Sequence, residues 1–314
     1  MLLPILSLLA GFILLMWSAD TFTDNGAKIA RIFNISPLVI GLLIFGFGTS
    51  APEMLVSGLA AYDGHPEMSI GNAFGSNILN IGLVLGVTAI ILPITVEKSV
   101  LKKEWLFLFL STLIVGFLLL DGFLSFTDGL ILISLLTLFL INVFRESKKN
   151  NLTNSDNDSL ENTSQKNDKG RTWLLLIVSL IILVFSARLV VWGGTSLALS
   201  FGVSDLIIGL TVVALGTSLP ELAVSISSTL KKQHQMVIGN IIGSNLFNTL
   251  GVLAIPGLIL PFQIPTEVMS RDYLFMLIFT LLVLILSMRL KISRFGGFIL
   301  LTALAIYLYQ LFWI

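Results

Sequence analysis

Cysteine is absent from the 314 residues, which excludes disulfide bonds and thiolate metal sites. Charged residues are also scarce, at 11% of the chain, whereas a soluble domain carries about a quarter. Hydrophobic residues make up 55%. Such a composition leaves too little polar surface to face water, and no soluble domain is expected.

Apolar runs of roughly 17–25 residues recur along the chain, and each is long enough to cross a hydrocarbon core of about 30 Å as a helix. They predict an all-α polytopic membrane protein with ten transmembrane helices, at residues 2–19, 36–62, 68–93, 105–121, 124–144, 172–192, 204–230, 236–260, 273–289 and 294–314. The first run follows no Lys or Arg and precedes no small-residue cleavage pattern, so we interpret it as a retained helix and not a signal peptide.

Basic residues gather on one side of this topology. With the N-terminus outside, the inward-facing loops hold 16 of the 18 Lys and Arg residues. The exceptions are Arg271, in an outward loop, and Arg188, inside a helix. Because cytoplasmic loops are enriched in Lys and Arg, we expect both termini to lie outside.

Residues 146–171 contain only two Leu among polar and charged residues, too little apolar area to order a packed structure. We expect a flexible cytoplasmic linker here. It separates a first five-helix repeat, residues 1–145, from a second, residues 172–314.

The two halves share a duplicated sequence. A shift of 168 residues aligns Ser18–Asn80 with Ser186–Asn248 without a gap, and 25 of the 63 pairs are identical. Five helices per repeat is an odd number, so the second copy is expected to enter the membrane from the opposite side. Inverted repeats of this kind are frequent in alternating-access transporters, with the substrate site near the midplane.

Glu53 and Glu221 occupy equivalent positions deep within apolar runs. An ionised group there costs at least a few kcal/mol and is by default a functional candidate. Arg188, the one basic residue in the interior of a predicted span, cannot neutralise two carboxylates, which points to a bound cation. The alternative is that both Glu side chains are protonated and donate structural hydrogen bonds.

Pro52 and Pro220 directly precede these Glu residues. Proline inside a helix removes an N–H and clashes with the carbonyl four residues earlier. Backbone oxygens around residues 46–49 and 214–217 are therefore expected to leave the helix ladder, which is tolerable in lipid only beside a protein-lined cavity or ligand. A simple proline kink is the alternative, but it does not explain why both copies join the kink to Thr, Ser and Glu.

Further oxygen-bearing side chains repeat at a spacing of four residues, which places each pair on one helix face. The pairs are Thr49 and Glu53, Ser76 and Asn80, Thr217 and Glu221, and Ser244 and Asn248. Hydroxyl, amide, carbonyl and carboxylate oxygens suit Ca²⁺, which takes 6–8 oxygen ligands, better than zinc or copper. Na⁺ also prefers oxygen.

Other repeated polar residues have a structural interpretation. The glycines of the two G-x-x-x-G motifs, at 71, 75, 239 and 243, are expected to let helices approach closely. We expect the neighbouring amides to satisfy backbone or interhelical hydrogen bonds; they are Asn72, Asn77, Asn240 and Asn245. His65 and His234 fall in predicted turns and are interpreted as solvated.

The paired blocks read GTSAPE and GTSLPE, at 48–53 and 216–221, and GNAFGSN and GNIIGSN, at 71–77 and 239–245. They resemble the two alpha repeats of the cation/calcium exchanger superfamily, specifically its sodium/calcium exchanger branch of prokaryotic type. The resemblance implies that Glu53 and Glu221 are the central Ca²⁺ and Na⁺ ligands. It implies supporting roles for the Thr49 and Thr217 carbonyls, Ser50, Ser218, Ser76, Ser244, Asn80 and Asn248, and the backbone at Gly46 and Ala214.

These observations together predict a sodium/calcium antiporter of the prokaryotic plasma membrane, which exchanges Ca²⁺ for several Na⁺ across the lipid bilayer. No enzymatic activity, cofactor or nucleic-acid partner is expected. Some relatives, including the potassium-dependent exchangers, have Asp where this chain has Asn248, so exchange independent of K⁺ is expected.

Proton-coupled calcium exchange is the first alternative. An intramembrane hydrolase lacks the required motifs, and a channel is disfavoured because such dense ligands would bind too tightly for fast conduction.

Overall fold

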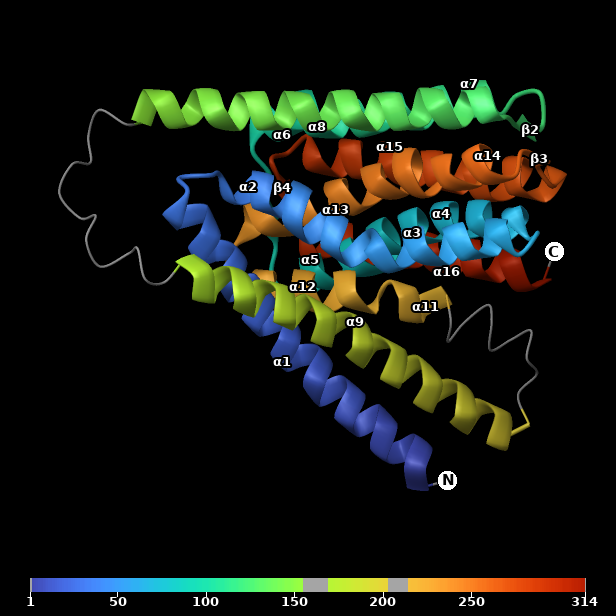
Figure 1. Ribbon diagram of the computed structural model, residues 1–314, viewed down its shortest axis with the longest axis horizontal. Helices are drawn as coiled ribbons and strands as arrows, with labels where there is room; N and C mark the ends of the chain where they lie inside the picture. The colour runs from blue at the N-terminus through green and yellow to red at the C-terminus, as the bar shows by residue number, and fades with distance from the viewer. Residues whose placement is uncertain (1, 155–168, 203–213, 314) are drawn as a thin grey trace.

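The computed structural model describes residues 2–154, 169–202 and 214–313 and is built almost entirely of helices (Figure 1). The first half contains α1 (Leu2–Ile32), α2 (Pro37–Ile40), the π-helical segment η1 (Gly41–Phe45), α3 (Gly46–Tyr62), α4 (Pro66–Leu79), η2 (Asn80–Leu85), α5 (Gly86–Ile91), β1 (Ile94–Thr95), α6 (Lys98–Val100), η3 (Leu101–Trp105), α7 (Leu106–Leu118), β2 (Phe123–Leu124) and α8 (Phe126–Asn154). The second half contains α9 (Lys169–Ser200), α11 (Ala214–Thr217), α12 (Leu219–Leu230), α13 (His234–Leu246), η5 (Phe247–Val252), α14 (Ala254–Ile259), β3 (Phe262–Gln263), η6 (Val268–Tyr273), α15 (Leu274–Ser287), β4 (Lys291–Ile292) and α16 (Arg294–Trp313).

Within the described residues, eight helical stretches are long and apolar enough to cross a membrane, by length and composition. They are Leu2–Ile32, Pro37–Tyr62, Pro66–Ile91, Phe126–Ser147, Lys169–Ser200, His234–Ile259, Val268–Ser287 and Arg294–Leu311. The expected span 105–121 belongs to a continuous helical stretch over 98–118, whose first part is made polar by Lys102, Lys103 and Glu104. Of the expected span 204–230, residues 204–213 lie outside the described part of the chain.

α1 and α9 are longer than the apolar runs that predicted them. α1 reaches Ile32, past the expected end at residue 19, and its 31 residues extend about 46 Å at about 1.5 Å each. The polar end of α1 is held against α12, because Lys231 Nζ lies 2.7 Å from Asp20 Oδ1 and 2.6 Å from Asp24 Oδ1. Tertiary contacts thus extend the helix beyond its apolar part.

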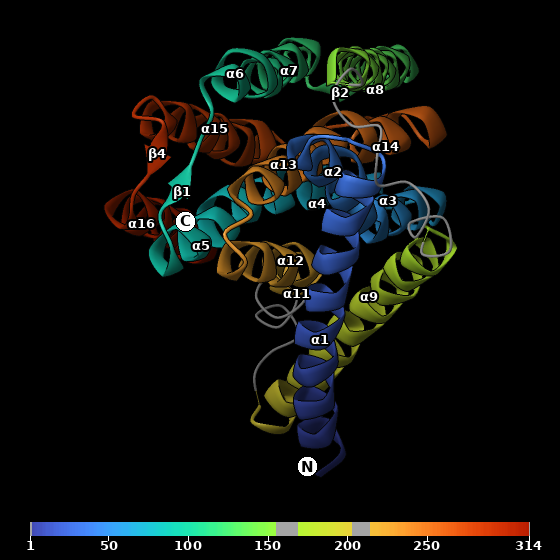
Figure 2. The ribbon, with the colours of Figure 1, turned by 90° about the vertical axis from the view of Figure 1, so that its left-hand side faces the viewer.

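α1 and α9 are equivalent by the 168-residue shift and lie side by side, oblique to most other helices (Figures 1 and 2). Glycine permits the close approach. An added Cβ at Gly11 would lie 2.8 Å from Val190, and one at Gly193 would lie 2.8 Å from the Pro4 carbonyl oxygen. The two repeats therefore contact each other through their first helices.

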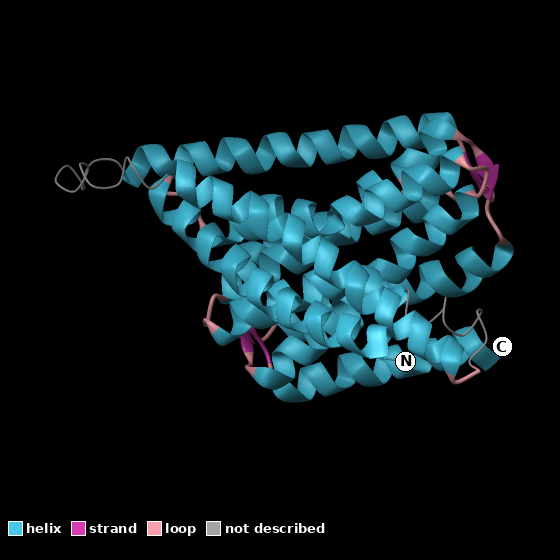
Figure 3. Ribbon diagram, turned by 60° about the horizontal axis from the view of Figure 1, so that its bottom comes forward, coloured by secondary structure: helices cyan, strands magenta, loops and turns pink. Residues whose placement is uncertain are grey.

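The short strands follow the same duplication. β1 pairs with β4, and β2 pairs with β3, both antiparallel. The shift of 168 residues maps β1 onto β3 and β2 onto β4, so the two small sheets are equivalent and each joins one repeat to the other. They lie at opposite ends of the molecule (Figure 3).

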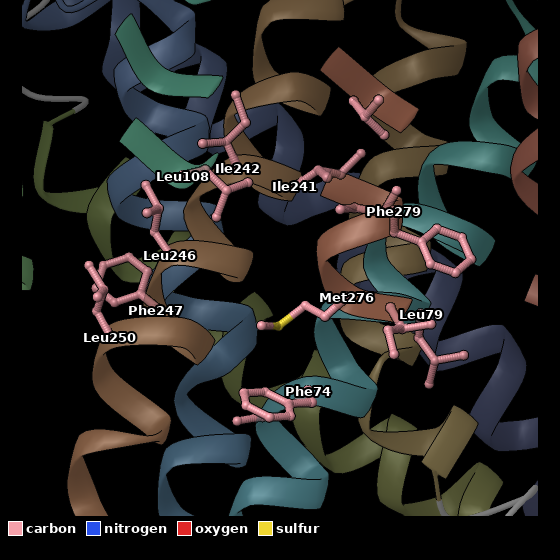
Figure 4. Packing of buried hydrophobic residues seen from close by; sticks show 14 of the residues in the cluster. Phe74, Leu79, Leu108, Ile241, Ile242, Leu246, Phe247, Leu250, Met276 and Phe279 are labelled. Carbon is pink, nitrogen blue, oxygen red and sulfur yellow. The ribbon is translucent and has the colours of Figure 1, made fainter. Parts of the chain in front are cut away.

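The surface is apolar, and the interior combines apolar with polar side chains. Large apolar side chains such as Phe117 and Phe295 are 73% and 74% exposed, whereas polar residues such as Thr49, Asn248 and Glu53 are fully buried. α13 and η5 lie at the centre, where Phe247 and Ile241 belong to a buried apolar cluster that includes Phe74 and Phe279 (Figure 4). An apolar exterior is suited to a lipid environment.

Both termini lie toward one end of the molecule, whereas the end of α8 and the start of α9 lie toward the other (Figure 1). α8 continues to Asn154 and α9 begins at Lys169, so helix occupies both edges of the expected linker 146–171. The remaining linker residues, 155–168, lie outside the described residues.

Candidate functional site

Glu53 on α3 and Glu221 on α12 are both buried, with 0% and 1% of their surface exposed. Their carboxylates repel one another electrostatically. No donor in the described residues makes a hydrogen bond of acceptable geometry to any of the four carboxylate oxygens, although the Thr49 and Ser50 hydroxyls interact with Glu221. Two buried carboxylates without a neutralising partner among the described residues are a candidate site for a cation.

The two prolines act differently, contrary to the expectation of equivalent breaks. α3 passes through Pro52 without interruption, whereas the helix bearing Glu221 is broken at Ser218, with φ −89° and ψ 4°, before α12 begins. Pro220 lies in the first turn of α12, where its missing N–H costs no helical hydrogen bond. Glu221 therefore lies near a helix N-terminus, and Glu53 lies within a helix.

Thr49 connects the Glu53 helix to the other repeat. Its hydroxyl donates to the Phe45 carbonyl at 2.9 Å and lies 3.2 Å from Ser244 Oγ. The Ser244 hydroxyl in turn lies 3.5 Å from the Gly46 carbonyl oxygen. The structure thus brings together three of the predicted site residues from α3 and α13.

Several other predicted ligands are buried with polar atoms that make no hydrogen bond of acceptable geometry to a described residue. These atoms are Ser50 Oγ, Ser218 Oγ, and both side-chain polar atoms of Asn80 and Asn248. Buried polar atoms are ordinarily hydrogen-bonded, so each of these unpartnered atoms is a candidate ligand for an ion or a water molecule. Ser76 is also buried, and Thr217 is half-buried. Ala214 begins α11, and its side chain lies outside the described residues.

The glycines at 239 and 243 pack against the backbone of the first repeat, as predicted. An added Cβ at Gly239 would lie 2.5 Å from the Leu38 carbonyl oxygen, and one at Gly243 would lie 2.4 Å from that of Leu42. The matching contact of residues 71 and 75 would involve residues 206–210, which lie outside the described residues. Close backbone contact therefore sets the distance between α13 and the Glu53 segment.

The repeated asparagines make the structural hydrogen bonds that were expected. Asn72 donates to the Glu53 carbonyl at 3.2 Å and to Ser57 Oγ at 3.1 Å. Asn77 donates to Thr249 Oγ1 at 2.7 Å, and Asn245 lies 3.5 Å from the Asn77 carbonyl oxygen.

Ser57 and its counterpart Ser225 support the site but were not predicted. Asn240 donates to Ser225 Oγ at 2.9 Å and to the Glu221 carbonyl at 3.3 Å, which repeats the pattern of the first copy. The identity of Ser57 and Ser225 at the 168-residue shift is the signal that could have found them.

The two histidines differ. His65 is exposed, with Nδ1 3.7 Å from Glu67, as expected of a turn residue. The solvated interpretation is wrong for His234, which is half-buried at the start of α13 with Nδ1 buried and no hydrogen-bond partner among the described residues. The turn before α13 packs against α1, and the sequence did not show this contact.

Widened helical turns flank the candidate ligands. η1 ends five residues before Ser50, η2 begins at Asn80, and η5 contains Asn248. π-helical turns are rare in proteins overall, and those that occur are often found at functional sites. They release backbone groups from the regular hydrogen-bond ladder of the helix. The sequence analysis did not predict them.

All candidate ligands present oxygen, and two carry formal charge. Within the described residues, no group of three or more His, Cys, Asp or Glu side chains could hold a metal ion. Two carboxylates among neutral oxygens suit a hard cation that must be released again, since affinity for Ca²⁺ depends on the number of charged ligands.

Comparison with known proteins agrees with this chemistry. The family model for "Sodium/calcium exchanger protein" matches residues 3–145 and 171–313. The chain is 41% identical to the putative antiporter CaxA of Alkalimonas amylolytica, over 99% of both chains, and 36% identical to the inner membrane protein YrbG of Escherichia coli, over 100% of this chain and 98% of YrbG. A structure of the sodium-calcium exchanger NCX_Mj, soaked without Na⁺ and Ca²⁺, superposes with a TM-score of 0.85, 37% identity and 99% coverage of both chains.

Proposed function

This chain belongs to the sodium/calcium exchanger protein family, and we propose that it is a K⁺-independent, electrogenic antiporter that moves one Ca²⁺ against several Na⁺. The burial of both Glu53 and Glu221, without a hydrogen bond of acceptable geometry from the described residues to any carboxylate oxygen, carries the proposal. Exchange would be secondary active transport, driven by the sodium gradient. Proteins of this family are transporters, so the buried carboxylates are assigned to ion binding and not to catalysis.

Glu53 and Glu221 are the proposed ligands shared by Ca²⁺ and Na⁺. One Ca²⁺ neutralises both carboxylates at a single position, whereas Na⁺ ions must occupy separate positions to supply the same charge. Attraction between unlike charges is strong in a low-dielectric interior, so the two ions compete for the same pair. If more positive charge enters as Na⁺ than leaves as Ca²⁺, each net charge moved is worth about 2.3 kcal/mol per 100 mV.

The neutral oxygens have supporting roles in this proposal. The Thr49 and Thr217 carbonyls would help to hold Ca²⁺. Na⁺ would take its remaining ligands from the group formed by Ser50, Ser218, Ser76, Ser244 and the backbone at Gly46 and Ala214. Asn80 and Asn248 would line the middle of the site.

We place these residues between two inverted five-helix repeats, residues 1–145 and 172–314, joined by the segment 146–171. The equivalent pairing of β1 with β4 and of β3 with β2 supports the duplication, and the odd number of predicted helices per repeat supports its inversion. The sorting of basic residues supports a prokaryotic plasma membrane location with both termini outside.

Flux through the purified full-length protein in proteoliposomes tests the exchange. We expect an outward sodium gradient alone to drive ⁴⁵Ca²⁺ uptake, with the membrane potential clamped and no pH gradient. Proton-coupled exchange, which the same carboxylates could support by protonation, predicts uptake driven by an outward proton gradient in the absence of Na⁺. Ca²⁺ uptake that depends on the proton gradient and not on the sodium gradient would contradict the proposal and support proton-coupled exchange.

A further inference from the structure

A cavity, which we call the basic cavity, lies between the end of α1 and the start of α13. Its volume is about 510 Å³. Polar and basic side chains from two distant segments line it, namely Arg31, Asn34, Lys232, Gln233, His234 and Gln235. None of them belongs to the candidate ion site.

The backbone around the cavity has an unusual feature. Non-glycine residues with positive φ are confined to three positions in the described chain, and two of them, Asn34 (φ 51°) and Lys232 (φ 59°), line the basic cavity. Each follows a helix whose end is closed by a backbone hydrogen bond, from Ile35 to Ala30 at 2.8 Å and from Gln233 to Ser228 at 2.9 Å. This type of helix end requires a left-handed residue, usually glycine.

The other repeat shows what the fold alone requires at these positions. The 168-residue shift pairs Lys232 with Gly64 (φ 88°) and Asn34 with Gly202 (φ 78°). The same turns thus carry glycine at the far end of the repeats and a polar side chain at the basic cavity. A lysine at positive φ is strained. Leu290, the third such residue, likewise replaces Gly122 of the other repeat and does not line the cavity, so the strain alone does not mark a function.

The charges in the cavity are free to meet a ligand. Among the described residues, neither the Arg31 guanidinium nor the Lys232 ammonium has a carboxylate within ion-pair distance, whereas the adjacent Lys231 has two. Glu97 is the acidic residue of the lining, and it already accepts hydrogen bonds from Gln235 and from Ser99 at 3.3 Å. The lining therefore carries a net positive charge.

The turn before α13 adds an unsatisfied polar atom. His234 Nδ1 is buried and has no hydrogen-bond partner among the described residues. A helix dipole accounts for a basic residue near a helix C-terminus, but not for two unpaired basic residues from different helices on one cavity, beside this imidazole.

We propose that the basic cavity binds a phosphate group through Arg31, Lys232 and the neighbouring amide and imidazole groups. Arg offers a planar set of donors that matches phosphate oxygens, and Lys supplies a point charge. The phosphate belongs either to an anionic phospholipid headgroup at the membrane surface or to a soluble phosphate compound. Once bound, it would join α1 to α13, the helix that carries Ser244.

Binding to the full-length protein in lipid nanodiscs tests the proposal without relying on transport. One arm titrates inorganic phosphate into phosphatidylcholine nanodiscs in calcium-free buffer, followed by phosphorus NMR. The other measures retention of phosphatidylglycerol from mixed phosphatidylglycerol and phosphatidylcholine nanodiscs by native mass spectrometry. Binding in the first arm identifies a soluble source, and binding in the second arm alone identifies a lipid.

Lys232→Gly and Arg31→Gln should each weaken binding at least tenfold. Lys232→Gly restores the residue that the backbone prefers, so its melting temperature should equal or exceed that of the unmodified protein and exclude misfolding as the cause. Lys102→Gln removes one exposed charge that does not line the cavity and should change binding less than twofold. An equal loss in all three variants, or no binding in either arm, would overturn the proposal.

Discussion

The side-chain amide of Asn240 lies 3.3 Å from the backbone carbonyl oxygen of Glu221 and donates a hydrogen bond to it. Asn72 makes the same hydrogen bond to Glu53 at 3.2 Å. In each repeat, the helix that bears the carboxylate is thereby fixed to the helix that follows it. We infer that these asparagines set the position of the Glu side chains although they are not ligands.

Asn240→Ala removes the hydrogen bonds to the Glu221 carbonyl and to Ser225 Oγ. Because the hydroxyl partner is left buried and unpaired, we expect a loss of about 1–3 kcal/mol in the free energy of unfolding and a higher Ca²⁺ concentration for half-maximal uptake. Thermal unfolding in detergent and initial rates of ⁴⁵Ca²⁺ uptake measure the two effects. Ser225→Ala is the matched control, since it removes one of the same hydrogen bonds. An unchanged melting temperature and unchanged Ca²⁺ uptake in Asn240→Ala would show that these hydrogen bonds do not position the Glu221 side chain.

Glu53→Gln and Glu221→Gln each remove one of the two buried charges and nearly preserve the side-chain shape. A single carboxylate cannot balance a divalent ion, so we expect sodium-driven Ca²⁺ uptake to fall to the level of empty liposomes in both variants. Glu67→Gln, which neutralises an exposed carboxylate, should retain normal uptake. Near-normal exchange in both buried variants would falsify their assignment as shared ligands.

The sequence predicted the fold class and the membrane character well, because apolar runs and duplicated blocks are local signals. It also singled out Glu53 and Glu221, both of which the structure buries in the interior. The contact of Thr49 with Ser244 joins residues 195 positions apart and depends on how α13 packs on the first repeat. No local pattern could show that contact.

Differences arose where tertiary contacts override local composition. The polar end of α1 remains helical because Lys231 forms ion pairs with Asp20 and Asp24. The hydrophobicity of the sequence alone does not reveal these ion pairs. Similar sequences around Pro52 and Pro220 also form different helices, because α3 continues through Pro52 whereas the second helix is broken at Ser218. A symmetric sequence can thus adopt two conformations when each copy packs against different neighbours.

The proposed orientation can be tested by cysteine labelling, because the chain contains no native cysteine. Cysteine introduced at Ser155, in the segment between the repeats, should react with a membrane-impermeant maleimide only after the cells are permeabilised. Asp63→Cys, in an exposed turn between α3 and α4, should react in intact cells. Labelling of the residue 155 variant in intact cells would show that the orientation is reversed.

Glu104 should make the stability of the protein depend on pH. It lies just before the expected span 105–121, and burial raises the pKa of its carboxyl from 4.5 to about 7. The folded protein therefore binds a proton that the unfolded chain releases between about pH 4.5 and pH 7, so stability falls as the pH rises through this range. We expect the melting temperature to be lower at pH 8 than at pH 5, with a smaller difference in Glu104→Gln.

The control for this pH effect is Glu67→Gln, because Glu67 is exposed. Its melting temperatures at pH 5 and pH 8 should differ as much as those of the unmodified protein. A pH dependence that is the same in all three proteins would assign the effect to other groups.

Exchange is expected to be independent of potassium because Asn80 and Asn248 are neutral. One Ca²⁺ balances the two carboxylates, so an added K⁺ would leave an uncompensated charge in a low-dielectric interior, which is costly. Sodium-driven Ca²⁺ flux should therefore proceed without K⁺ in either compartment.

Asn248→Asp supplies a third negative charge and should introduce potassium sensitivity or an altered pH dependence. Asn245→Asp, at a buried amide outside the proposed ligands, serves as the charge-matched control. If removing K⁺ from both sides stops flux in the unmodified protein while the membrane potential is clamped by other means, the two-carboxylate account of ion selectivity is wrong.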